Sequence, residues 1–172
     1  MILMQIVYFL TYEYSFKLWK ETGNISRESQ YFKFISSKHP DYFFYFISYG
    51  NEKDESFTPF LKNSKIIPIY KYMKYDKNKF KRFIRSFKIP FILKKILRNE
   101  NIDIIKQNQL QGIWVSLFFK LLMKKPLITR TGYDVLSFKI SEKKGIHKII
   151  FFYLLTQLSL IFSDIYTVTS NT

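Results

Sequence analysis

Short runs of β-branched and aromatic residues alternate along the chain with stretches whose apolar residues recur at helical spacing. The runs that predict strands are residues 5–10, 42–49, 65–70, 102–106, 126–129 and 164–169. Apolar residues three and four apart predict helices over residues 25–37, 110–123 and 143–163. This alternation is typical of βαβ units, so it predicts an α/β fold with a Rossmann-like, doubly wound and mostly parallel sheet.

Some stretches depart from this regular alternation. The polar residues 11–24 and 51–63 are predicted to be loops. Pro68 has no backbone N–H to donate, so the third strand is expected at a sheet edge. Residues 77–98 carry an apolar stripe at helical spacing, and Pro90 is expected to kink or divide that helix. The stripe consists of Phe80, Phe83, Ile84 and Phe87.

Length and composition limit the classes of protein. The 172 residues, 47% hydrophobic and 24% charged, suit one globular domain spanning residues 1–172. The absence of cysteine excludes disulfides, thiolate catalysis and thiolate zinc sites. His39 and His147 have no carboxylate cluster at ligand spacing, so no transition-metal site is expected. Residues 1–10 lack the basic region of a signal peptide, and the apolar residues 149–162 are too few to span a membrane.

The chain is strongly basic, with a formal net charge of +15 and a pI near 9.8. It has no alanine and is rich in residues whose codons are rich in A and T, so nucleotide bias accounts for part of this charge. What remains is a cluster without acidic residues, formed by Lys77, Lys79, Lys81, Arg82, Arg85, Lys88, Lys94, Lys95 and Arg98. One interpretation places this segment on an anionic membrane surface. The favoured interpretation is a crossover helix whose phenylalanines face the sheet while its lysines face water. Nucleic acid is not expected as a partner.

Candidate functional residues follow the strands, because ligands of open α/β sheets bind outside the carboxyl ends of the strands. Those after the first strand are Trp19, Gly23, Arg27 and Glu28, and those at or after the fourth are Lys106, Asn108 and Gln109. Arg130, Gly132, Tyr133 and Asp134 follow the fifth strand, and Asn171 follows the sixth. Amides, hydroxyls and flat aromatic rings suit recognition of a polyol. The structural alternative is that Asn108 and Gln109 only cap the next helix, Gly132 serves a turn and Trp114 packs in the core.

Short motifs narrow the choice of enzyme class. The sequence lacks G-x-G-x-x-G, G-x-x-x-x-G-K-[ST] and G-x-S-x-G, so nicotinamide dehydrogenases, P-loop ATPases and enzymes with a serine elbow are poorly supported. The pattern W-x-x-x-G-x-x-x-R-E in residues 19–28, with KQNQLQGIW in 106–114 and RTGY in 130–133, resembles the amino-terminal domain of glycosyltransferase family 4 enzymes of the GT-B fold. Residues 163–170 resemble the family's AD-x-[IV]-x-x-x-S strand, with serine in place of the small residue.

This resemblance covers nearly the whole chain, and it implies the acceptor-side half of a retaining, nucleotide-sugar-dependent glycosyltransferase for cell-surface polysaccharide or lipopolysaccharide. The partner would be a sugar or a lipid-linked acceptor, in the cytoplasm or peripherally on the inner face of the membrane. In such enzymes a second domain binds the nucleotide-sugar donor. No cofactor is therefore expected in this chain, which would be a fragment of a longer enzyme or unable to transfer sugar alone. Many members have a histidine-aspartate pair where this chain has Tyr133 and Asp134, so Arg130, Tyr133 and Asp134 are candidates only for facing the active site.

Two alternatives to sugar transfer stay open. A non-catalytic basic module would bind a membrane surface or single-stranded nucleic acid through the interleaved aromatic and basic residues 70–91. Binding that weakens steeply with salt would identify such a module. A sugar-nucleotide epimerase of GT-B architecture would instead act on the donor alone.

Overall fold

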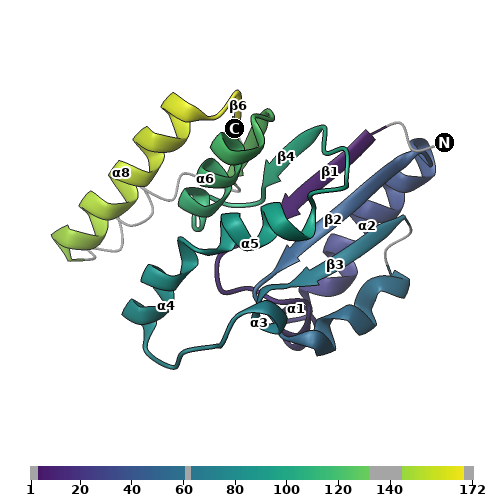
Figure 1. The fold of residues 1–172 in the computed structure, drawn as a ribbon, viewed down its shortest axis with the longest axis horizontal. Coiled ribbons are helices and arrows are strands. Elements are labelled where there is room, and N and C mark those ends of the chain that lie inside the picture. The colour runs from purple at the N-terminus through teal and green to yellow at the C-terminus, as the bar shows by residue number, and fades with distance from the viewer. Residues whose placement is uncertain (1–3, 61–62, 132–144, 169–172) are drawn as a thin grey trace.

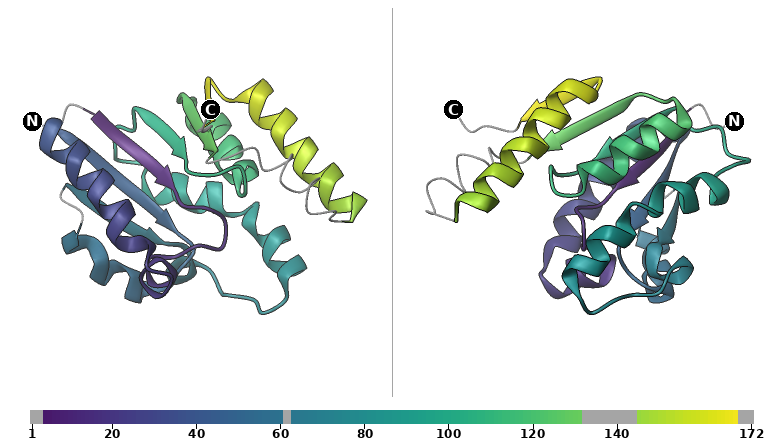
Figure 2. Two further views of the ribbon diagram at one scale, coloured as in Figure 1. Left: turned by 180° about the vertical axis from the view of Figure 1, so that it is seen from behind. Right: turned by 60° about the vertical axis from the view of Figure 1, so that its left-hand side comes forward.

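The computed structural model describes residues 4–60, 63–131 and 145–168, and among them parallel strands form one sheet with helices on both faces (Figure 1, Figure 2). The strands are β1 (Met4–Phe9), β2 (Tyr42–Ser48), β3 (Ser64–Pro68), β4 (Ile104–Gln107), β5 (Leu127–Thr131) and β6 (Ile165–Val168). Their order in the sheet is β3-β2-β1-β4-β5-β6. The predicted α/β fold with a doubly wound parallel sheet is confirmed.

The central strands are buried on both faces, which explains their nearly continuous apolar sequences. In β1, Val7 and Phe9 belong to one core cluster, while Ile6 and Tyr8 belong to the other. The neighbouring β2 alternates in the same way, because its residues pair with those of β1 in parallel register. The sheet therefore separates two cores, each of which needs its own layer of helices.

Helices lie on both sides of the sheet. One face is covered by α1 (Phe16–Glu21), α2 (Asn24–Lys38) and the 3-10 helix η1 (Glu52–Phe60). The other is covered by α5 (Ile89–Ile96), α6 (Ile113–Met123) and α8 (Ile146–Phe162). α3 (Ile69–Tyr72) and α4 (Lys79–Ser86) connect β3 to α5 beyond the carboxyl ends of the strands (Figure 1).

Both expectations about proline are confirmed. β3 lies at the sheet edge and ends at Pro68, and Pro90 stands at the start of α5, so the basic segment is divided into α4 and α5. The two predicted loops are wrong, because residues 11–24 contain α1 and residues 51–63 contain η1. A contact distant in sequence explains the first: the buried carboxylate of Asp54, in η1, accepts hydrogen bonds from the N–H groups at the start of α1, those of Phe16 at 3.0 Å and Lys17 at 3.2 Å.

The favoured interpretation of the basic segment is also wrong for α4. Phe80, Ile84 and Phe87 are exposed to solvent, whereas the residues of α4 that are buried are Arg82 and Ser86. Helical spacing indicates which residues share a face but not which face points inward. In α5 the expectation holds in part: Ile89 and Leu93 are buried and the lysines are exposed, but Phe91 is 54% exposed and does not face the sheet.

Candidate functional site

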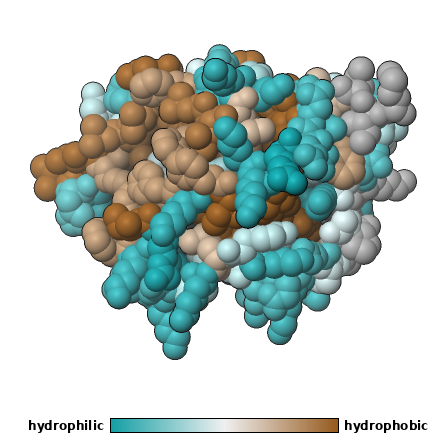
Figure 3. All heavy atoms as spheres, in the orientation of Figure 1, coloured by the Kyte–Doolittle hydropathy of each residue, from teal (hydrophilic) through white to brown (hydrophobic). Residues whose placement is uncertain are grey.

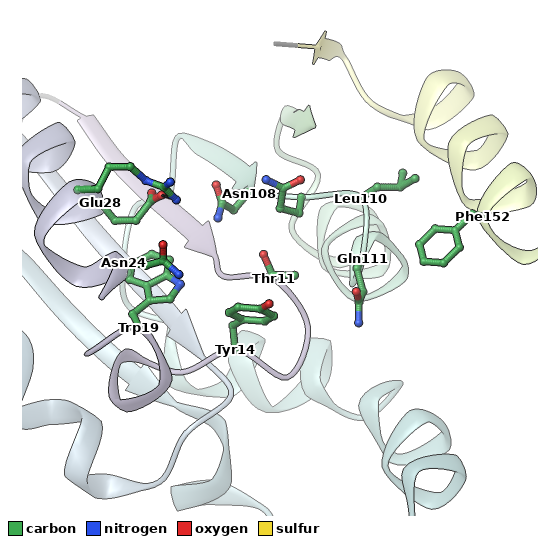
Figure 4. Close-up of a pocket in the computed structure, with 11 residues that line it drawn as sticks. Thr11, Tyr14, Trp19, Asn24, Glu28, Asn108, Leu110, Gln111 and Phe152 are labelled. Atoms are coloured by element: carbon green, nitrogen blue, oxygen red, sulfur yellow. Dashed lines mark hydrogen bonds and ion pairs between the residues drawn. The ribbon is translucent and has the colours of Figure 1, made fainter. Parts of the chain in front are cut away.

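The strand order reverses direction between β1 and β4: β2 and β3 follow β1 toward one edge of the sheet, and β5 and β6 follow β4 toward the other. The connections that leave β1 and β4 therefore run to opposite faces of the sheet and leave a crevice between them. A cavity of about 330 Å³ lies at the carboxyl ends of these strands. In Figure 4, side chains from the start of α2 and from α1 stand on one side of the cavity, and those that follow β4 stand on the other. The residues that line it are Thr11, Tyr14, Trp19, Asn24, Arg27, Glu28, Asn108, Gln109, Leu110, Gln111 and Phe152.

The loop after β1 is a tight turn that brings Thr11 and Tyr14 to the cavity. The N–H of Tyr14 donates to the carbonyl of Thr11 at 2.8 Å, and Glu13 between them has a φ of 66°. This left-handed conformation is unfavourable for a residue with a Cβ, so other contacts must hold the turn. One is the ion pair in which Nε of Arg82 donates to the Glu13 carboxylate at 2.6 Å.

Trp19 is positioned by α1, whose first turn is fixed by side-chain acceptors. Ser15 Oγ accepts a hydrogen bond from the N–H of Leu18 at 3.1 Å. The Asp54 carboxylate accepts hydrogen bonds from the N–H groups of the two preceding residues, Phe16 and Lys17. Trp19 is 4% exposed, and its ring packs against Phe16 with centroids 5.2 Å apart. The cavity therefore reaches only a small part of the indole.

The first turns of α2 contribute a polar face. Gly23 precedes the helix with a φ of 72°, which lets the chain turn directly from α1 into α2. Asn24 and Glu28 are four residues apart and Arg27 adjoins them on the same side, as expected for a helical surface. Arg27 Nη2 lies 3.0 Å from Glu28 Oε1, so this side of the cavity presents a paired cation and anion.

Tyr8 of β1 orients Asn108, the first residue after β4. Its hydroxyl donates to Asn108 Oδ1 at 2.6 Å, in a contact between buried side chains. Burial raises the pKa of Tyr8 far above its ordinary value, so the hydroxyl keeps its proton and remains the donor. Asn108 Oδ1 is thereby fixed as the acceptor, and the amide's NH₂ group is left to donate toward the cavity (Figure 4).

Two residues that do not line the cavity shape the loop that does. The buried side chain of Gln107 donates through Nε2 to the carbonyl of Gln109 at 2.9 Å. Gly112 has a φ of 104°, and a Cβ built there would lie 3.0 Å from the Cβ of Tyr12. The N–H of Tyr12 donates to the carbonyl of Gln111 at 3.1 Å, which ties the β1 and β4 loops together.

The structure brings together several of the residues predicted from sequence and leaves others apart. Those that line the cavity are Trp19, Arg27, Glu28, Asn108 and Gln109. Gly23 serves the turn before α2 and does not line it. Lys106 points toward α2, where its Nζ lies 3.2 Å from the Tyr31 hydroxyl, and the half-buried Arg130 of β5 is also absent from the lining. Gly132, Tyr133, Asp134 and Asn171 lie outside the described residues, so their role stays a prediction.

Four polar residues of the lining, Thr11, Tyr14, Asn24 and Gln111, were not predicted from the sequence as candidate binding residues. The strand-end rule did point to both loops that supply them. What it could not supply was the position of each side chain in a loop, because that depends on the turn at Glu13 and on the α1 helix that was expected to be a loop.

The cavity combines amides, hydroxyls, aromatic rings and an ion pair, a set of groups that can both donate and accept hydrogen bonds. Within the described ranges, no group of three or more metal-ligating side chains is found. No helix in this part of the chain is long and apolar enough to cross a bilayer. No protein-family model matches the chain, and no curated protein matches it as a relative.

Proposed function

We propose that this chain is the acceptor-binding half of a nucleotide-sugar-dependent, retaining glycosyltransferase of the family 4 kind, acting in the synthesis of cell-surface polysaccharide or lipopolysaccharide. The observation that carries the proposal is the convergence of two segments on one cavity. Residues 19–28 and 106–114 each resemble that family in sequence, and both supply lining residues at the carboxyl edge of the sheet.

The chemistry of the lining supports a sugar as the ligand. Asn108 offers an oriented NH₂ donor, and Glu28 offers a carboxylate acceptor for a ring hydroxyl. Arg27 adds a charged donor beside that carboxylate. Tyr14 is partly exposed in the same cavity, so its ring provides a flat surface for the apolar face of a pyranose.

Under this proposal the nucleotide-sugar donor binds a second α/β domain, and transfer takes place between the two. The chain itself then supplies acceptor binding and orientation, which bring the acceptor hydroxyl to the donor carbon. The proposed place of action is the cytoplasm or the inner face of the membrane, where nucleotide-sugars and lipid-linked acceptors meet.

Acceptor binding is the first step to test. Saturation-transfer difference NMR with a panel of methyl hexosides and N-acetylhexosaminides is expected to show weak binding of a subset. Asn108→Asp keeps the acceptor for Tyr8 but removes the NH₂ donor, so it is expected to weaken that binding roughly fivefold. Asn51→Asp, an exposed change outside the cavity, is the matched control. If no sugar binds, or if Asn108→Asp and Asn51→Asp bind equally well, the proposal fails.

A further inference from the structure

Helix α4 presents its apolar face to solvent. Phe80 is 71% exposed, Ile84 52% and Phe87 41%. These residues are spaced by four and three, so they form one continuous stripe on the helix surface. An ordinary amphipathic helix of a globular protein would turn such a stripe toward the core.

This orientation is fixed by Arg82 on the opposite side of the helix. Its side chain is 8% exposed, and Nε donates to the Glu13 carboxylate at 2.6 Å. The same guanidinium donates through Nη1 to the carbonyls of Asp76 at 2.8 Å and Lys77 at 3.0 Å, and it stacks over the Tyr75 ring. Rolling the helix to bury the stripe would break the ion pair and leave Glu13 without this partner.

Ser86 supports the same orientation one turn further on. Its buried hydroxyl accepts a hydrogen bond from Trp114 Nε1 at 2.8 Å and donates to the carbonyl of Phe83 at 2.6 Å. The polar side of α4 is thus matched to polar partners on the body of the protein. Exposure of the apolar stripe is therefore part of the folded state.

The stripe continues onto α8 through aromatic contacts. The Phe83 ring packs against Phe87 at 5.5 Å, Trp114 at 5.2 Å and Phe151 at 6.4 Å. Phe151 and Leu154 of α8 are themselves exposed. Figure 3 shows an extended apolar surface over the side of the molecule where Figure 1 places α6 and α8, with hydrophilic side chains projecting beside it near α4.

Basic residues flank this surface. Lys77, Lys79, Lys81 and Lys88 are all exposed, and residues 77–98 contain no acidic side chain. The nearest carboxylate before them, that of Asp76, is paired with Arg85 at 3.2 Å. A surface that offers both apolar side chains and exposed ammonium groups matches a lipid bilayer, in which hydrocarbon lies beneath negatively charged headgroups.

We infer that α4 and the adjoining end of α8 dock the protein on an anionic lipid bilayer, with Phe80, Ile84 and Phe87 inserted among the acyl chains and the lysines at the level of the headgroups. The helix lies on the surface, because it is only eight residues long. Single-stranded nucleic acid fits less well, since Ile84 has no ring on which a base could stack. The inference does not rest on the proposed sugar site.

Sedimentation with phosphatidylcholine vesicles, with and without phosphatidylglycerol, tests the inference on the whole chain. Binding is expected only to the anionic vesicles. The triple change Phe80→Ser, Ile84→Ser and Phe87→Ser is expected to weaken it roughly tenfold or more. Changing Lys77, Lys79, Lys81 and Lys88 to Gln is expected to weaken it by up to roughly a thousandfold.

Matched controls lie on α2, which covers the opposite face of the sheet (Figure 2). Phe34 is 62% exposed, so Phe34→Ser removes a comparable exposed ring, and Lys33→Gln with Lys38→Gln removes exposed charge there. These changes are expected to alter vesicle binding by less than about twofold. Equal losses in the α4 and α2 variants would overturn the inference, as would binding that survives the triple serine change.

A fluorescent probe on α4 reports insertion into the bilayer directly, without relying on a variant that loses binding. Phe80→Trp places an indole on the exposed stripe, and anionic vesicles are expected to shift its emission to shorter wavelength, after subtraction of the parent protein's spectrum. No shift at vesicle concentrations that sediment the protein would contradict insertion. Binding of a single-stranded oligonucleotide without binding of vesicles would assign the basic segment to nucleic acid instead.

Discussion

Gly50 lies so close to Asp54 that a Cβ at position 50 would collide with the Asp54 carboxylate. That carboxylate is buried, accepts from the Ser48 hydroxyl, and holds the first N–H groups of α1. Gly50 therefore provides the space for a side chain that links β2, η1 and α1. Because α1 carries Trp19 to the cavity, this packing also shapes the candidate site.

Gly50→Ala is expected to destabilise the protein by about 2–3 kcal/mol, because Asp54 must shift and its partners lose their acceptor. Urea unfolding followed by circular dichroism measures this change. Gly23→Ala is the control, since Gly23 has a positive φ but no atom within 4 Å of the added Cβ. That control should cost only the backbone strain of about 1 kcal/mol. Equal effects of the two changes would show that the space for Asp54 is unimportant.

Arg82→Ala is expected to destabilise the protein by about 3 kcal/mol, because it leaves the Glu13 carboxylate, itself partly buried, without its close cation. Glu13 also sits in a left-handed turn, so loss of the pair should loosen the loop that carries Thr11 and Tyr14. Arg85→Ala removes a pair with Asp76 in which the arginine side chain is 41% exposed, against 8% for Arg82, so it should cost less than about 1 kcal/mol. Comparable losses for the two arginines would contradict the role given to Arg82.

Asp164 is expected to make the free energy of unfolding depend on pH in the acid range. Hydrogen bonds from Lys120 and from the N–H of Leu127 lower the pKa of Asp164 below its ordinary value. A carboxyl with a lowered folded-state pKa stabilises the protein above its ordinary pKa and loses that contribution as the pH falls toward the folded-state value. The side chain is 45% exposed, so solvent screening limits the effect to less than about 1 kcal/mol.

Asp164→Asn should therefore lower stability at neutral pH and make little difference at strongly acid pH. Urea midpoints of the two proteins between neutral and strongly acid pH would converge on the acid side. Lys120→Met should remove most of the same pH-dependent contribution, because Lys120 is the larger cause of the shift. Parallel profiles for Asp164→Asn and the parent protein would show that this carboxyl is not the source.

The sequence allowed the sheet to be predicted because each strand carries its own signal. β1 and β2 are buried on both faces, so their apolar runs are continuous and bounded by polar residues. α1 was missed because the Asp54 carboxylate that holds its start lies in η1, far along the chain. The orientation of α4 was missed for a similar reason, since it depends on a pair between Arg82 and the distant Glu13.

The candidate site was predictable to the level of loops but not of side chains. Asn108 and Gln109 follow the end of β4, where the strand-end rule applies directly. Lys106 lies within β4 itself, and strand alternation turns it toward Tyr31 and α2, away from the cavity. Lys106 and Asn108 are only two positions apart, but Asn108 lies beyond the end of β4 and reaches the cavity, whereas Lys106 does not.

Tyr8→Phe tests whether the candidate site depends on an oriented amide. The tyrosine hydroxyl fixes Asn108 Oδ1 as an acceptor, and without it the amide is free to turn its oxygen toward the cavity. Sugar binding is expected to weaken roughly threefold, while the free energy of unfolding falls by only about 1 kcal/mol. Tyr45→Phe is the matched control, because its hydroxyl bonds to Glu100 and lies away from the cavity lining. NMR titration of both variants with the sugar that the parent protein binds would separate the two effects, and equal affinities would show that Tyr8 does not orient Asn108 for binding.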